Sequence, residues 1–341
     1  MKQIFAAVLM LVCAVTVASA ADPDRMRIGY IAEPAHGLHF LAKEKGYFKE
    51  EGIDAELYQF STTAEGLTAL KAGRLDVGTF GTAAPLLFIS KGSEFTIFGG
   101  MMIGGQAIIA RPENVANLKK LENYRGKKIG MAKLTTGDVI FRSALLKAGM
   151  DWRKNDYTVV EFPSVGNVVE AVKKGAVDAG IVFSPHFTLA EKQGLKVAHF
   201  IEDFYPDYTC CRLDANTKDF NERKDAFKRF LIAEIRAYRF YRTSPEETVQ
   251  IFTKALKIDE EVVRKDTYTR KAFECNPDPL KKGTIDFWRQ MRAIGYIPND
   301  YPIEKHINTE VYRQALETVI KREPKDKIYQ EMLAFYKKNN Q

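Results

Sequence analysis

Four loops of this chain carry hydroxyl residues where predicted strands give way to predicted helices. The residues concerned are Ser61, Thr62, Thr82 with Ala83, Thr135, Thr136 with Gly137, and Ser184. The first turn of a helix presents unpaired backbone N–H groups, so hydroxyls placed there could help to hold an anion or another oxygen-rich head group. Each Ser or Thr could instead cap its own helix. We predict these residues as ligand-binding and keep capping as the alternative.

Acidic, imidazole and phenol side chains near the same loops would be unnecessary in a site for a bare anion. They are Glu33 and His36 after the first predicted strand, His186, and Asp207 and Tyr208 in a later connecting segment. An amine, amidine or ring N–H on the solute would give the carboxylates a role, whereas a simple anion would be repelled by them. We predict all five as ligand-binding and leave both an anion and a heterocycle open. His39 is expected to be a helix-surface or packing residue.

No pattern in the sequence pairs a nucleophile with a base. Ser-x-x-Lys, Gly-x-Ser-x-Gly and His-Glu-x-x-His are absent. Cys210, Cys211 and Cys275 fit neither a zinc ribbon nor a Cys-x-x-Cys redox pair. One of the adjacent pair could bridge Cys275, or all three could be buried as small apolar residues. We expect no enzyme activity, no cofactor and no metal site.

The first twenty residues have the features of a secretory signal peptide. Lys2 precedes the apolar run 4–17, and Ala18-Ser19-Ala20 provides a cleavage site of small residues. The apolar run is too short to span a hydrocarbon layer about 30 Å thick. We expect cleavage after Ala20, export to the periplasm as a soluble protein, and no lipid anchor at Cys13.

The charge is modestly basic and lies mainly in the last third of the chain. The formal net charge is +7, and residues 221–341 contain 25 Lys+Arg against 19 Asp+Glu. Because these charges are spread over predicted helices without a long basic block, they indicate a solvated cationic face. We do not expect nucleic-acid binding.

Strand-like and helix-like segments alternate twice along the chain. The first series runs over residues 26–110 and the second over 126–201, and helical periodicity continues from residue 222 onward. Alternation of this kind predicts an α/β protein of two lobes, each a mostly parallel sheet flanked by helices, followed by a helical C-terminal tail.

The predicted lobes are built from separate parts of the chain. Lobe 1 should comprise residues 21–111, completed by about 205–341, and lobe 2 should comprise residues 112–204. We expect the chain to cross between them near Ala110-Arg111-Pro112 and again between Asp203 and Arg212. Two crossings would form a hinge.

A short unit in which glycine is followed three residues later by aspartate and an apolar strand occurs in both series. The aspartates are Asp76 and Asp178. A carboxylate just before a buried strand can accept backbone N–H groups from a turn. We expect both to be structural and to mark equivalent units in the two lobes.

Several segments resemble the periplasmic solute-binding proteins of the sulfonate/taurine/nitrate group, a family that also includes binders of a pyrimidine precursor of thiamine. The segments are residues 46–53, 70–78 and 81–85 in the first series, and 125–130, 171–179 and 183–186 in the second. At 183–186 the chain has Phe-Ser-Pro-His where related proteins often have Trp-acid-Pro-aromatic, so it lacks both the acid and the indole.

The resemblance implies a type II periplasmic-binding-protein fold and an extracytoplasmic receptor for an ABC importer. Such a receptor would be a monomer that closes its lobes around a small polar organic solute, such as a sulfonate or a taurine-like compound, and delivers it to a permease and ATPase complex. Three alternatives remain: a receptor for a pyrimidine or another heterocycle, a pyrimidine-synthase-like enzyme on the same fold, and an exported sensory module.

Overall fold

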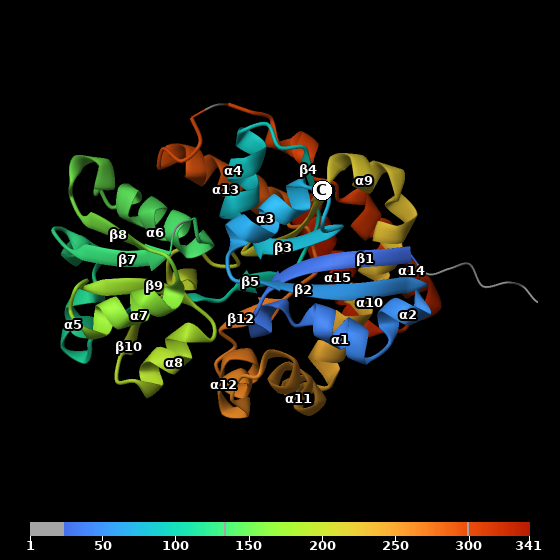
Figure 1. The fold of residues 1–341 in the computed structure, drawn as a ribbon, viewed down its shortest axis with the longest axis horizontal. Helices are drawn as coiled ribbons and strands as arrows, with labels where there is room; N and C mark the ends of the chain where they lie inside the picture. Colours follow the sequence, from blue (N-terminus) through green and yellow to red (C-terminus); the bar gives the residue numbers. More distant parts are fainter. Residues whose placement is uncertain (1–23, 133, 299) are drawn as a thin grey trace, which may run out of the picture.

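The first of two mixed sheets forms the right-hand part of the molecule in Figure 1. The structure is a computed structural model that describes residues 24–132, 134–298 and 300–341. The expected signal peptide and Cys13 lie outside these residues. Within the described ranges, no helix has both the length and the apolar character needed to cross a bilayer.

The first sheet has five strands, of which four are parallel. Their spatial order is β2 (Ile53–Phe60), β1 (Asp24–Ile31), β3 (Val77–Gly81), β11 (Cys211–Asn216) and β4 (Phe95–Gly100). Only β11 is antiparallel, and it pairs with β3 on one side and β4 on the other.

The second sheet repeats this arrangement. Its order is β8 (Thr158–Phe162), β7 (Lys128–Ala132), β9 (Ala179–Phe183), β6 (Gln106–Ala110) and β10 (Lys196–Phe200). Here β6 is the antiparallel strand and lies between β9 and β10. Both sheets therefore share one topology, with the antiparallel strand in the fourth position. The predicted α/β fold of two mostly parallel sheets is confirmed.

The first crossing between the sheets lies earlier in the chain than expected. Residues 106–110 belong to the second sheet, so the chain crosses at Met101–Gly105 and not at Ala110-Arg111-Pro112. Gly104 and Gly105 have positive φ angles of 75° and 97°, which allow the chain to turn there. Pro112 starts helix α5 (Pro112–Leu118), where a missing N–H costs nothing. The second crossing lies between Phe200 and Cys211, as predicted.

Helices cover the outer faces of both sheets. The first lobe contains α1 (Leu38–Glu44), α2 (Tyr47–Glu50), α3 (Thr63–Lys71) and α4 (Ala83–Ser90); the second contains α5, α6 (Thr136–Lys147), α7 (Val165–Lys173) and α8 (His186–Lys192). The last third supplies α9 (Thr217–Glu222), α10 (Lys224–Thr243), α11 (Pro245–Leu256), α12 (Glu260–Arg264), α13 (Lys281–Ala293), α14 (Glu310–Arg322) and α15 (Lys327–Asn340).

Helix α10 attaches the C-terminal region to the first sheet. Its apolar face buries Phe227 and Phe230, and the ring of Phe98 on β4 lies 5.0 Å from the ring of Phe227 in an edge-to-face arrangement. Such aromatic pairs contribute about 0.5–1.5 kcal/mol beyond the burial of their area. Helix α10 is therefore part of the first lobe's core.

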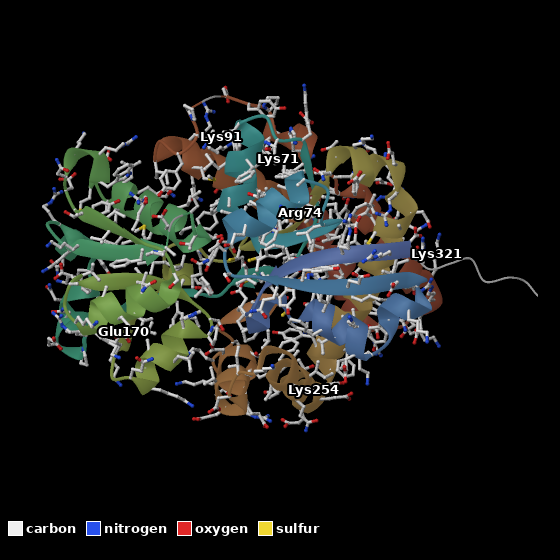
Figure 2. All side chains as sticks on the ribbon, viewed as in Figure 1. Lys71, Arg74, Lys91, Glu170, Lys254 and Lys321 are labelled. Atoms are coloured by element: carbon white, nitrogen blue, oxygen red, sulfur yellow. The ribbon has the colours of Figure 1, made fainter. Side chains whose placement is uncertain are left out.

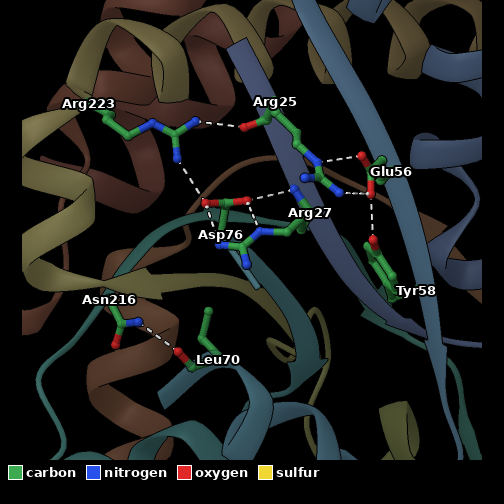
Figure 3. A network of polar contacts seen from close by, with 8 residues as sticks. All are labelled: Arg25, Arg27, Glu56, Tyr58, Leu70, Asp76, Asn216 and Arg223. Atoms are coloured by element: carbon green, nitrogen blue, oxygen red, sulfur yellow. Dashed lines mark hydrogen bonds and ion pairs between the residues drawn. The ribbon is translucent and has the colours of Figure 1, made fainter. Parts of the chain in front are cut away.

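Asp76 and Asp178 occupy equivalent structural positions. Asp76 accepts the backbone N–H of Arg27 at 2.7 Å, and Asp178 accepts the backbone N–H of Lys128 at 2.8 Å. In Figure 3, Asp76 also receives the guanidinium groups of Arg27 and Arg223. Each aspartate thus ties the strand that follows it to a neighbouring parallel strand, β1 or β7, and the two positions are equivalent, as expected, although the donors lie in strands and not in a turn.

Charged side chains cover the outside of both lobes (Figure 2). Lys71 and Glu170 are exposed on helices of the first and second lobes, and Lys254 and Lys321 are exposed on helices of the C-terminal region. These exposed lysines agree with the solvated basic face expected for the last third of the chain.

Candidate ligand site between the lobes

The two lobes meet where helices α4 and α6 begin. The carbonyl oxygen of Cys210, in the second crossing, accepts the backbone N–H of Thr82 at 2.7 Å and also the Thr82 hydroxyl. The Thr136 hydroxyl of the other lobe lies 3.5 Å from the same oxygen. The Cys210 carbonyl oxygen therefore lies between the first turns of α4 and α6, where we expected the head group of a solute to bind. Ala83, the first residue of α4, is fully buried beside it.

Gln106 links helix α6 to the same crossing. Its side-chain oxygen accepts the backbone N–H of Gly137, and its side-chain nitrogen lies 3.4 Å from the sulfur of Cys210. Gln106 is only 4% exposed. The start of α6 is thus held by a side chain from the antiparallel strand of its own sheet.

Glu33, His36 and Cys211 form a buried cluster beside this junction. Glu33 Oε1 lies 3.0 Å from His36 Nε2 and 4.0 Å from Cys211 Sγ. His36 Nδ1 accepts the backbone N–H of Ile31 at 3.2 Å, so the hydrogen of a neutral ring is on Nε2. His36 Nε2 is nevertheless not aligned for a hydrogen bond with Glu33 and has no hydrogen-bond partner.

Burial controls protonation in this cluster. It raises the pKa of Glu33, with a smaller contribution from nearby Cys210, and lowers the pKa of His36 to about 3. Burial likewise raises the pKa of Cys211. Burial thus favours the neutral form of each of the three groups. Their oxygen, nitrogen and sulfur atoms lie within 4.8 Å of one another, which also makes them a possible donor set for a metal ion.

The two crossing segments contact each other through Glu202. Its Oε1 accepts the backbone N–H of Gly105 at 3.0 Å, and burial raises its pKa to about 7. Tyr208 is 1% exposed in the second crossing, and its hydroxyl has no hydrogen-bond partner. Tyr208 is thus placed at the junction, as we expected, and offers a free polar group there.

Two of the predicted hydroxyls cap helices. Thr62 accepts the backbone N–H of Glu65 and completes a capping box on α3, and Thr135 accepts the backbone N–H of Asp138 on α6. Ser61, beside Thr62, is exposed. The capping alternative therefore describes Thr62 and Thr135 in this structure.

Other predicted residues lie away from the junction or have their side chains engaged. The Ser184 hydroxyl donates to Asp266 at 2.7 Å. His186 lines a surface hollow of about 420 Å³ between α7 and α8, together with Ser164, Asn167 and other residues. Asp207 is exposed in a turn with a φ of 53°, so it is not the buried acid that we expected.

The C-terminal region forms hydrogen bonds with the second lobe on two sides of the junction. Asp266, in a π-helical turn after α12, accepts both Ser184 and Thr188 from the start of α8. The hydroxyl of Tyr296, just after α13, donates to Asp138 of α6. In Figure 1, α12 and α13 lie on opposite sides of the region where the lobes meet. The C-terminal region therefore contacts both lobes, which we did not predict.

His39 belongs to a buried polar chain in the first lobe. Its ring nitrogens lie 2.8 Å from Glu234 Oε1 and 2.7 Å from Thr79 Oγ1, and all three residues are 0% exposed. The order of acid, imidazole and hydroxyl is that of a hydrolase triad, but no substrate can reach groups so fully buried. His39 is a packing residue, as predicted.

Three residues that the structure brings to the junction or its flank carry no functional signal in the sequence. Gln106 follows a Gly-Gly turn, Asp266 lies in a charged helix about 80 residues from its partners, and Cys211 suggests only a disulfide or a buried small residue. Cys210, Cys211 and Cys275 are all free and buried, so the disulfide alternative is wrong for this structure.

Known proteins are similar to this chain in sequence and in fold. A putative binding protein of Brucella abortus is 29% identical over 290 residues, which are 84% of this chain and 88% of that protein. A pyrimidine phosphate synthase of Aspergillus parasiticus is 27% identical over 150 residues, but these cover only 44% of this chain and 42% of the synthase.

Two solved structures have the same fold. The nitrate-binding protein NrtA of Synechocystis superposes with a TM-score of 0.76 at 18% identity, covering 87% of this chain and 89% of NrtA. The aliphatic sulphonate-binding protein SsuA of Escherichia coli superposes with a TM-score of 0.72 at 18% identity, covering 84% and 92%. The predicted periplasmic-binding-protein fold is thus confirmed. A model of the NMT1-like family matches residues 19–256, more than half of the chain, and the chain therefore belongs to the NMT1-like family.

Proposed function

We propose that the protein is the extracytoplasmic solute-binding receptor of an ABC importer and captures a small polar organic solute between its lobes. The observation that carries the proposal is the pair of sheets with identical strand order, joined by two crossings and meeting at a buried polar junction. In such sheets ligands bind beyond the carboxyl ends of the parallel strands. The family match and the full-length likeness to binding proteins support the same role.

The chemistry of the junction favours a solute with two kinds of polar group. The donors of Thr82 and Thr136 are taken by the Cys210 carbonyl, so a solute must compete for them with a strong acceptor such as a sulfonate oxygen. Glu33 and His36 add a carboxyl and an imidazole, which a bare inorganic anion would not need. A sulfonate or a taurine-like compound has this combination.

A second candidate solute is a pyrimidine or a related heterocycle. The partial match to a pyrimidine phosphate synthase favours it, and Glu33 with His36 could pair with ring N–H and ring nitrogen atoms. The enzyme alternative has less support, because the match covers less than half of that synthase.

The receptor role implies partners and a location. We propose a monomer in the periplasm that delivers its solute to a membrane permease and ATPase. One structural neighbour, from Staphylococcus aureus, is the ligand-binding component of an ABC-type import system, which supports this role. Opening and closing of the lobes would exchange the solute, and small-angle scattering with and without solute would measure the change.

Thermal-shift screening tests the proposal and separates the candidate solutes. Sulfonates, taurine, nitrate, bicarbonate, carboxylates and pyrimidines would be compared, because a solute at a hundred times its Kd adds about 2.7 kcal/mol to stability. Calorimetry on Thr136→Val, with Ser61→Ala in an exposed loop as the control, locates the site. We expect weaker binding in Thr136→Val alone. A solute that binds both variants like the wild type would contradict the junction as its site.

A further inference from the structure

Glu33, His36 and Cys211 bring three different donor atoms together at the carboxyl edge of the first sheet. Glu33 and His36 lie in the loop after β1, and Cys211 begins β11. Their exposed fractions are 5%, 0% and 3%, so all three side chains are buried from bulk solvent. The sulfur of Cys210 lies 3.9 Å from that of Cys211 and adds a second thiol beside the group.

We propose that Glu33, His36 and Cys211 bind a thiophilic divalent cation, with Zn²⁺ as the representative ion. Carboxylate, imidazole and thiolate are the ligand types of zinc sites, and one carboxylate, one imidazole and one thiolate together neutralise a divalent charge. Mg²⁺ and Ca²⁺ prefer sites made of oxygen atoms alone, so the thiol and the imidazole select against them.

The spacing of the donor atoms is close to that of a coordinated ion. Bonds of about 2.0–2.3 Å in a tetrahedron place neighbouring ligand atoms about 3.3–3.8 Å apart. The distances here are 3.0 Å between Glu33 and His36 and 4.0 Å between Glu33 and Cys211, and all three atoms lie within 4.8 Å. Shifts of less than about an ångström would therefore complete the site, well within side-chain motion.

His36 Nε2 provides an independent indication of a missing partner. It is a fully buried nitrogen with no hydrogen-bond partner, and it lies on the Glu33 side of the ring. Most buried polar atoms have a partner, so an exception calls for an explanation. A cation would replace the hydrogen on Nε2, and the hydrogen of the neutral ring would then be on Nδ1. Nδ1 could no longer accept the Ile31 N–H, and the loss of that hydrogen bond limits the affinity for the cation but does not block the site.

A cation held by these three side chains would have one coordination position left for a further ligand. Three protein ligands and an open fourth position are typical of zinc sites that bind a further oxygen ligand. An oxyanion group of the captured solute could take that position. Metal binding itself is measured without any solute, so it can fail while the proposed receptor role holds, and the reverse is also true.

Cobalt titration of the purified protein, stripped with a chelator, tests the proposal. Co²⁺ bound to a thiolate absorbs in the near ultraviolet, and Zn²⁺ should displace it, whereas Mg²⁺ should not. Cys211→Ser should abolish the thiolate absorption and weaken Zn²⁺ binding about tenfold or more. Cys275→Ser is the matched control, because Cys275 is also a free buried thiol and lies outside the cluster.

Glu33→Gln provides a second test if Cys211→Ser does not fold, because it preserves the shape of the side chain and removes its charge. It should weaken Zn²⁺ binding while the circular dichroism spectrum stays unchanged. The proposal is overturned if the wild type binds Zn²⁺ no more tightly than Mg²⁺, if Cys211→Ser retains the cobalt–thiolate absorption, or if Cys275→Ser loses binding as strongly as Cys211→Ser.

Discussion

Replacing Glu202 by glutamine should make the protein more stable at neutral and alkaline pH. The carboxyl group joins the two crossings by accepting the backbone N–H of Gly105. Burial raises its pKa from 4.5 to about 7, and its second oxygen has no partner. The folded state therefore binds the Glu202 proton more tightly than the unfolded state does. Glutamine retains the oxygen that accepts from Gly105 and has no proton to lose.

The sign and size of the effect follow from this raised pKa. Below about pH 4.5 the carboxyl is protonated in both states, and stability is lost as the pH rises from there to about 7. A shift of about 2.5 pKa units corresponds to about 3 kcal/mol once the group is ionised in both states. Between about pH 5 and about pH 8, the stability gained by Glu202→Gln over the wild type should therefore grow by about 2 kcal/mol.

Urea denaturation at the two pH values measures this difference directly. Glu222→Gln serves as the control, because Glu222 is an exposed glutamate whose replacement should shift stability equally at both pH values. The reasoning would be refuted if Glu202→Gln were no more stable relative to wild type at about pH 8 than at about pH 5. Such a result would mean that water reaches the carboxylate in the folded protein.

Three further variants test other features of the junction. Asp266→Ala removes the acceptor of two hydroxyls from α8 and should lower the unfolding free energy by about 2 kcal/mol in urea denaturation; an unchanged value would show that the hydroxyls find other partners. Gly137→Ala would place a Cβ 2.1 Å from Gln106 Oε1, so its melting temperature should fall, and unaltered melting would contradict the tight contact. Asp207→Asn changes an exposed turn residue and should leave solute affinity unchanged by calorimetry, whereas a tenfold loss would return Asp207 to the site.

Local patterns predicted the elements of this fold well, because each element carries its own signal. The helix at Pro245–Leu256 begins at a proline, which suits the first turn of a helix. Both aspartates of the repeated unit are structural, as expected, although their N–H donors lie in neighbouring strands and not in a turn. The first strand-and-helix series was predicted to extend to residue 110, but residues 106–110 form a strand of the second sheet. Strand pairing depends on distant partners, and the sequence of β6 is apolar enough to suit either sheet.

The candidate site was predicted in part, for a similar reason. Residues at helix starts next to buried strands can be recognised from sequence, and Thr82, Thr136 and Glu33 do meet at the junction. The identity of their partner could not be recognised, because the Cys210 carbonyl is a backbone atom brought there by the second crossing. Asp266 could not be foreseen either, since its role depends on how the C-terminal helices pack.

The position of β11 in the first sheet has a consequence for how a newly made chain can fold. Among the described residues, β11 is the only strand that pairs with the edge strand β4 in its sheet. An isolated bridge joins Ile97 of β4 to Ile307. A growing chain that has emerged only as far as residue 200 would therefore contain β4 without its partner strand β11 and without Ile307. The first sheet can therefore be completed only after all strands of the second lobe have been made. During synthesis or translocation, the first sheet stays incomplete until β11 has emerged.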